Sequence, residues 1–113
     1  MYMLSFDSPQ ALDAVFAALG DARRRDMVAR LSAGEMPLSA LSAPYGMSQT
    51  AATRHVRVLS DAGIVRVEKR GRTRFCRLTA AGLKDAAEWI EAYRGFWDDQ
   101  LSALAAHLSE EPE

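Results

Sequence analysis

Apolar residues in the first third of the chain recur every three or four positions, which is the period of an amphipathic helix. In the first such stretch they are Leu12, Val15, Phe16 and Leu19. Ser8-Pro9 provides an N-cap followed by proline at the first helical position, and Gly20 ends the pattern. Asp21 is placed to cap a second helix, which Gly34 follows. We therefore predict two consecutive helices, with the run Arg23-Arg24-Arg25 as a solvated first turn of the second.

A short helix, a turn and a longer helix are predicted next. The short helix covers Ser39 to Ala43, because Pro44 cannot continue it, and Tyr45-Gly46-Met47 forms the turn. Ser48 stands at the N-cap of the longer helix, where its hydroxyl can accept a hydrogen bond from the amide of residue 50 or 51. This helix runs to Ala62, and the next residue is a glycine that permits a left-handed stop.

The helix predicted over residues 48–62 has two faces of different chemistry. Ala52, Val56 and Leu59 share one face, with His55 beside them, where we expect a buried structural histidine. The opposite face carries hydrogen-bonding and cationic side chains without an acid among them. These are Gln49, Thr50, Thr53, Arg54 and Arg57.

After this helix the period changes from helical spacing to alternation, which indicates strands. Residues 64–69 and 73–78 are predicted to pair as a hairpin, with Arg70-Gly71-Arg72 at its tip. Thr79 then caps a final helix from about residue 80 to about residue 108, on the order of 40 Å long. The chain is thus predicted to be mainly α-helical with a small β-hairpin wing.

The length and amino-acid composition of the chain indicate the class of protein to which it belongs. With 113 residues and 49% apolar residues, the chain suits a single domain over residues 1–113. No stretch approaches the roughly 18 apolar residues of a membrane span, and the first ten residues lack the pattern of a secretory signal. We expect a cytoplasmic protein without a membrane partner. Cys76 is the only cysteine, so it cannot form a disulfide within the chain, and we expect it to be a small buried side chain.

Charge is segregated along the chain although the net charge is only -1. Residues 54–77 contain eight basic and two acidic side chains, a net charge of +6, which leaves -7 on the remainder. One surface is therefore suited to a polyanion, while the rest of the protein repels it.

Two helices joined by a tight turn, the second with a polar and basic face, form a helix-turn-helix motif, whose second helix fits the major groove of DNA. Glutamine and arginine side chains can pair with the edges of adenine and guanine, and threonine can contact either base edges or the thymine methyl. We predict base contacts from Gln49, Thr50, Thr53 and Arg54. We predict phosphate or minor-groove contacts from Ser48, Arg57, Arg70, Arg72 and Arg74.

The sequence resembles the ArsR/SmtB family of winged helix-turn-helix regulators from about residue 15 to residue 108. The most specific segments are Met47 to Leu59, Ala62 to Val65 and the tip Arg70-Gly71-Arg72. Leu19 to Ala22 is similar to the opening of the family's second helix, although Ala22 replaces the proline often found there. The resemblance implies a dimer built from four helices, a two-stranded wing and a fifth helix, which represses transcription by occupying an operator.

The metal ligands of many members of that family are missing. No Cys-x-Cys pair lies near the third helix, and Phe96 stands at about the position of a ligating histidine on the last helix. His107 and Glu110 share one helical face, but two ligands per chain rarely suffice for zinc. We therefore predict no regulatory metal and no cofactor.

A stripe of apolar side chains continues to the end of the last helix, where no later segment of the same chain can cover it. We expect a homodimer through the first and last helices, which should bury Leu12, Val15, Phe16, Trp97, Leu101, Leu104 and Leu108. Trp89, Tyr93 and Phe96 are expected to pack in the core or the dimer, with an aromatic pocket for a small-molecule inducer as the alternative.

Two other functions compete with DNA binding. An enzyme is excluded because the two histidines are far apart, the one cysteine lies on a strand, and the chain has neither a glycine-rich phosphate loop nor a pair of acids in an apolar setting. The alternative is a protein-interaction module that uses a winged helix without touching DNA, and the +6 segment argues against it.

Overall fold

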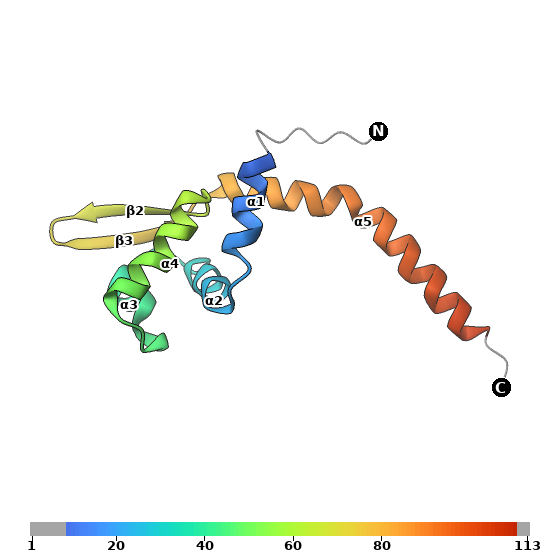
Figure 1. The fold of residues 1–113 in the computed structure, drawn as a ribbon, viewed down its shortest axis with the longest axis horizontal. Helices are drawn as coiled ribbons and strands as arrows, with labels where there is room; N and C mark the ends of the chain where they lie inside the picture. The colour runs from blue at the N-terminus through green and yellow to red at the C-terminus, as the bar shows by residue number, and fades with distance from the viewer. Residues whose placement is uncertain (1–8, 111–113) are drawn as a thin grey trace.

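The structure is a computed structural model that describes residues 9–110. Within them the chain forms the winged helix-turn-helix predicted from the sequence (Figure 1). The elements follow in the order α1 (Pro9–Ala18), α2 (Ala22–Leu31), β1 (Met36–Pro37), α3 (Leu38–Ser42), η1 (Ala43–Tyr45), α4 (Gln49–Asp61), β2 (Val65–Arg70), β3 (Thr73–Leu78) and α5 (Ala80–Ser109). The Ser8 cap expected for α1 lies outside the described residues.

Three of the predicted signals at helix ends, Ser48, Asp21 and Gly63, act as expected. The hydroxyl of Ser48 accepts a hydrogen bond of 3.1 Å from the amide of Ala51. Asp21 caps α2 by accepting from the amides of Arg23 and Arg24, at 2.8 and 3.2 Å. Gly63 has a φ of 77°, the left-handed conformation that ends α4 and that a side chain would disfavour. These caps depend on neighbours in the sequence, which is why sequence reasoning located them.

The sheet differs from the predicted hairpin by one short strand. β1 pairs with β3, so the strand order is β1-β3-β2, with Met36 opposite Cys76 and Pro37 opposite Phe75. The helix α3 begins at Leu38 rather than Ser39, directly after this strand. Pro44 does not end the helical region at once, because it occupies the 3-10 turn η1, where its missing amide is tolerated.

The core lies between the helices α1 to α4 and one face of the hairpin. Its largest fully buried side chains are Val15, Met27, Leu41, Leu59, Ile64 and Cys76. The buried face of α4 contributes Ala52, Val56 and Leu59, so the same packing that fills the core points the polar face of α4 outward.

The start of α5 is pressed against the turn between α4 and β2. The amide of Gly82 donates to the carbonyl of Gly63 at 3.0 Å, and a Cβ at Gly82 would lie only 2.5 Å from the carbonyl oxygen of Ala62. Thr79 occupies the N-cap position of α5, but its hydroxyl donates to the carbonyl of Gly63 at 2.6 Å instead of capping the helix. The expected side-chain cap is therefore replaced by a tie between α5 and this turn.

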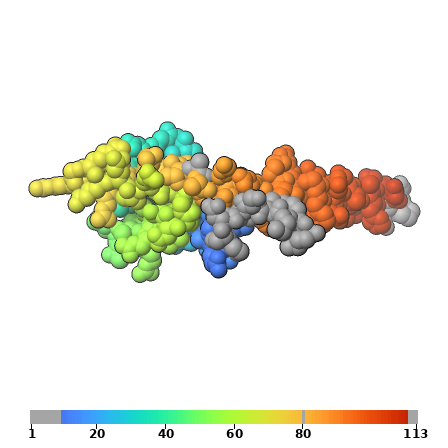
Figure 2. All heavy atoms as spheres, turned by 90° about the horizontal axis from the view of Figure 1, so that it is seen from above, coloured from blue at the N-terminus to red at the C-terminus, as the bar shows by residue number. Residues whose placement is uncertain are grey.

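The helix α5 begins against α1 and then extends away from the body of the protein (Figure 1). The wing and the far end of α5 lie at opposite ends of an elongated molecule (Figure 2). Every residue from Arg94 to Glu110 is exposed, including large apolar side chains. Among the described residues, no helix is both long enough and apolar enough to span a bilayer.

Candidate nucleic-acid interface

The polar face of α4 is accessible in the structure. Gln49, Thr50, Arg54 and Arg57 are exposed, and Thr53 is half-buried. Together these five side chains line a shallow hollow of about 360 Å³. The structure therefore brings together the whole set of α4 residues that the sequence predicted, apart from the capping serine that precedes them.

The hairpin turns one of its faces toward α4. Strand alternation and register place Lys69 and Arg74 opposite each other, on the same face as half-buried Val67 and buried Cys76. A groove of about 560 Å³ separates this face from α3 and α4, and its lining includes Gln49, Lys69, Arg72 and Arg74. The wing cations and the polar residues of α4 thus belong to one continuous surface.

Lys69 also lines this groove, although it is not among the DNA contacts predicted from the sequence. It ends the predicted strand 64–69 and so lies outside the predicted basic tip. The alternation of Val65, Val67 and Lys69 was the signal that would have placed its side chain beside Arg74.

Arg70 was predicted to contact DNA, but the structure engages its guanidinium within the protein. It donates to both carboxylate oxygens of Glu35, at 2.8 and 2.9 Å, and to Glu68 at 2.9 Å. The guanidinium carbon also lies 4.6 Å from the centre of the Phe75 ring. The Arg70 hydrogen bonds hold the pKa of Glu35 below its usual value, and those to Glu35 and Glu68 raise the pKa of Arg70.

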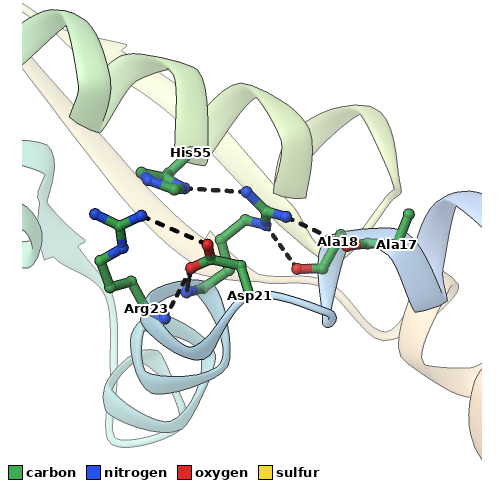
Figure 3. A network of polar contacts seen from close by, with 6 residues as sticks. Ala17, Ala18, Asp21, Arg23 and His55 are labelled. Carbon is green, nitrogen blue, oxygen red and sulfur yellow. Dashed lines mark hydrogen bonds and ion pairs between the residues drawn. The ribbon is translucent and has the colours of Figure 1, made fainter.

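A second polar network holds α4 against the end of α1 (Figure 3). The Nε of Arg24 donates to the carbonyl of Ala18 at 2.7 Å, and its Nη2 donates to Ala17 at 3.3 Å. Its Nη1 lies 3.1 Å from Nδ1 of His55, a buried residue of α4. The prediction of a solvated arginine run is therefore wrong for Arg24, because this side chain satisfies carbonyl groups left free at the end of α1.

The environment of His55 favours its neutral form. Burial lowers the pKa of His55, and the nearby positive charges of Arg23, Arg24 and Arg54 lower it further, while the carboxylate of Asp21 acts in the opposite direction. This agrees with the predicted structural role of His55. Its imidazole orients α4, and we assign it no contact with DNA.

Arg30 and Tyr45 join α2 to the segment that precedes α4. Arg30 donates to the carbonyls of Leu41 and Ala40, at 2.6 and 3.0 Å, and also to the hydroxyl of Tyr45. That hydroxyl donates to Asp26 at 2.5 Å. The first helix of the helix-turn-helix, α3, and the turn η1 are thereby held to α2 by polar contacts as well as by the core.

The residues predicted to form a dimer interface divide into three groups by exposure. Val15 is 1% exposed because it packs inside the protomer, so it offers no free surface and its assignment to the interface needs correction. Leu12 is half-buried, and Phe16 is 38% exposed and packs edge-on against Trp89, with 5.7 Å between ring centres. The remaining members are more than half exposed on α5: Trp97, Leu101, Leu104 and Leu108.

Within the part of the chain that the structure describes, Cys76 is isolated from water and the acidic side chains do not gather into a metal-binding cluster. Cys76 is fully buried, and burial raises the pKa of its thiol. Within residues 9–110 no three histidine, cysteine, aspartate or glutamate side chains lie close enough together to hold a metal ion. The absence of a regulatory metal stays a prediction.

Comparison with known proteins relates the chain to transcriptional regulators. A helix-turn-helix domain family matches residues 19–68. The crystal structure of an ArsR family transcriptional regulator is 30% identical, over 81% of this chain and 95% of that one, with a TM-score of 0.75. The transcriptional repressor SdpR of Bacillus subtilis (strain 168) is 23% identical over 87 residues, which cover 77% of this chain and 97% of SdpR.

The fold is also found in a homodimeric winged helix-turn-helix DNA-binding domain from Mycobacterium bovis. That domain is 22% identical, with a TM-score of 0.59 over 88% of this chain and 95% of its own length. At this level of identity the likeness concerns the fold.

Proposed function

The chain belongs to the ArsR family of transcriptional regulators, and we propose that it binds double-stranded DNA as a homodimer and represses transcription from an inverted-repeat operator. It is a regulator and not an enzyme. The proposal of repression is supported by its similarity to a transcriptional repressor. The site of action would be the cytoplasm, without a metal or other cofactor.

One observation carries the proposal of DNA binding: the polar face of α4 and the wing cations line the same surface. Gln49 borders both the hollow on α4 and the groove beneath the wing. When α4 lies in the major groove, Arg72 and Arg74 would reach the flanking backbone or the minor groove. Base reading is assigned to Gln49, Thr50, Thr53 and Arg54, and phosphate binding to Ser48, Arg57, Lys69, Arg72 and Arg74.

Homodimerisation is proposed through α5 and the exposed part of α1. Trp97, Leu101, Leu104 and Leu108 are 57%, 62%, 54% and 62% exposed, which leaves a large apolar stripe in water. Burial of one leucine stabilises by about 1.5–3 kcal/mol, so several per protomer can outweigh the entropy of association. Leu12 and Phe16 would adjoin this stripe. We assign Trp89 and Tyr93 to packing, since their rings are in contact with 4.8 Å between centres, and propose no inducer.

A dimer would place two α4 helices on one side of the duplex. Half-sites are then expected about one helical turn apart, roughly 34 Å, or a multiple of that distance. A winged-helix domain from Mycobacterium bovis that shares this fold is a homodimer, which supports the same assembly here.

A gel shift with two DNA duplexes tests the proposed function. One duplex is selected from a random-sequence pool by the wild-type protein, and the other is of mixed sequence. We expect tighter binding to the selected duplex and an affinity for both that falls steeply with salt, because phosphate contacts release counterions. If neither duplex shifts at low salt, the protein does not bind DNA, and a protein-interaction module becomes the better reading.

A further inference from the structure

We propose that Arg70 does not contact DNA but acts as a strap that sets the position of the wing, through its bonds to Glu35, Glu68 and the Phe75 ring. The inference rests on the proposed function, because the wing matters only if it meets DNA. The proposal gives a positioning role to Glu35, an acidic residue that is not among the site residues predicted from the sequence.

The side chain of Arg70 crosses the sheet from one edge toward the other. Arg70 ends β2, and β3 lies between β2 and β1. Its guanidinium passes over Phe75 of β3, which is the diagonal neighbour of Arg70 and lies two residues beyond its pairing partner Thr73. It then reaches Glu35, which directly precedes β1. One side chain thus connects the far end of the hairpin to the segment that follows α2.

Arg70 also points away from the surface proposed to bind DNA. Residues that face each other in the register share a side of the sheet, so Arg70 lies with Glu68 and Phe75, and Lys69 lies with Arg74. Only the second set lines the groove beside α4. Two carboxylates already balance the charge of Arg70, so it has little attraction left for a phosphate.

The geometry of the cluster formed by Arg70, Glu35, Glu68 and Phe75 is of the kind that lets an exposed ion pair fix the position of a segment. A single surface ion pair contributes little to stability, but a bidentate arginine–carboxylate pair within a network is the recognised exception. Here Arg70 binds Glu35 in a bidentate manner, it also binds the carboxylate of Glu68, and the Phe75 ring lies beneath its guanidinium. The cluster therefore limits the orientations of the hairpin tip, which a bare two-stranded ribbon would leave free.

The variant Glu35→Gln distinguishes a DNA-contacting role of Arg70 from a positioning role, because the two roles predict opposite changes in DNA affinity. If Arg70 served DNA, freeing it and removing a negative charge would tighten binding. If Arg70 is a strap, the same change loosens the wing, which must then become ordered when DNA binds. The entropy cost of ordering one or two side chains corresponds to binding that is about two- to tenfold weaker. Affinity is measured by gel shift on the selected duplex, and tighter or unchanged binding by Glu35→Gln overturns the proposal.

Asp61→Asn is the matched control for charge. Asp61 is an exposed acid at the end of α4, and its removal changes the net charge equally without touching the strap. This variant should bind DNA as tightly as the wild type or more tightly. Weaker binding by Asp61→Asn would show that loss of any nearby carboxylate weakens the complex, and the strap would be rejected.

Arg70→Lys tests the bidentate pair with Glu35, because lysine keeps the positive charge but cannot make two parallel hydrogen bonds to one carboxylate. We expect it to weaken DNA binding as much as Glu35→Gln does, and the double variant with Glu35→Gln to be no weaker than either alone. In the free protein, both single variants should lower the backbone order parameters of Gly71 and Arg72 measured by NMR relaxation. Unchanged order parameters, or full affinity in Arg70→Lys, contradict the strap.

The salt dependence distinguishes failure of this inference from failure of the proposed function. Arg72→Ala should reduce the slope of log affinity against log salt by about one, whereas Glu35→Gln should leave the slope unchanged. If the wild type binds no DNA, the proposed function and the strap both fail. If the wild type binds and Arg72→Ala behaves as described, a tighter Glu35→Gln variant rejects the strap alone.

Discussion

The Nη1 of Arg24 lies 3.1 Å from Nδ1 of His55, across the junction of α2 and α4. A guanidinium can only donate hydrogen bonds, so Nδ1 must accept and the imidazole must be neutral, with its proton on Nε2. The contact ties the buried side of α4 to a side chain that also caps α1. The orientation of the proposed recognition helix therefore depends on the protonation state of one histidine.

Stability should consequently fall when His55 gains a proton. Burial lowers its pKa in the folded state below the ordinary value of 6.5, so the unfolded chain binds the proton more readily. The contribution of His55 is complete above pH 6.5 and is lost as pH falls through the lowered pKa. Urea unfolding at fixed protein concentration, between about pH 8 and about pH 5, measures this dependence.

The two histidines provide a variant and its control. His55→Gln keeps a hydrogen-bond acceptor for Arg24 but does not titrate, so it should flatten the pH dependence in this range. His107→Gln alters an exposed residue of α5 and should leave that dependence in place. The role assigned to His55 is refuted if its replacement leaves the pH dependence unchanged.

Two glycines of α5 should respond in opposite directions to alanine. Gly82→Ala places a Cβ 2.5 Å from the carbonyl oxygen of Ala62, so it should destabilise the protein by about 1–3 kcal/mol. Gly95 has open space around it and is helical, so Gly95→Ala should stabilise by about 0.5–1 kcal/mol. Urea unfolding measures the free energy of unfolding of both variants. A higher stability in both would contradict the close contact between Gly82 and the carbonyl of Ala62.

Base reading by α4 can be separated from general DNA binding. Gln49→Ala and Arg54→Ala should each lose about 1–3 kcal/mol of discrimination between the selected and mixed-sequence duplexes, while weak binding to both persists. Competition gel shifts measure the ratio of the two affinities. Equal losses on the two duplexes would show that these side chains contact the backbone rather than the bases.

The dimer should depend on the apolar stripe of α5. Leu101→Glu combined with Leu104→Glu should give a folded monomer that binds the selected duplex no better than mixed DNA, or an unfolded chain. Sedimentation gives the mass, and circular dichroism distinguishes the two outcomes.

A control for this variant places the same charges on the opposite side of the helix. Ala103→Glu combined with Ala106→Glu has the same spacing, lies about half a turn from the leucines, and should leave the dimer intact. A monomeric wild type, or a Leu101 and Leu104 double variant that stays dimeric with full affinity, would rule out the proposed interface.

The sequence alone determined those features that depend on residues within a few positions of one another. The Ser48 cap, the left-handed Gly63 and the polar face of α4 all follow from local hydrogen bonding and from helical periodicity. The change to alternation after Gly63 likewise located the hairpin. Such signals identified the helix-turn-helix and its wing before any tertiary contact was known.

The tertiary structure alone decided which side chains lie on the proposed DNA-binding surface and which are engaged within the protein. Arg70 meets Glu35 across 35 positions, and Arg24 meets His55 across 31. Val15 turns into the core while the adjacent Phe16 stays at the surface. Charge counted along a chain cannot separate such neighbours, because their partners come from segments brought together only by the packing of the core.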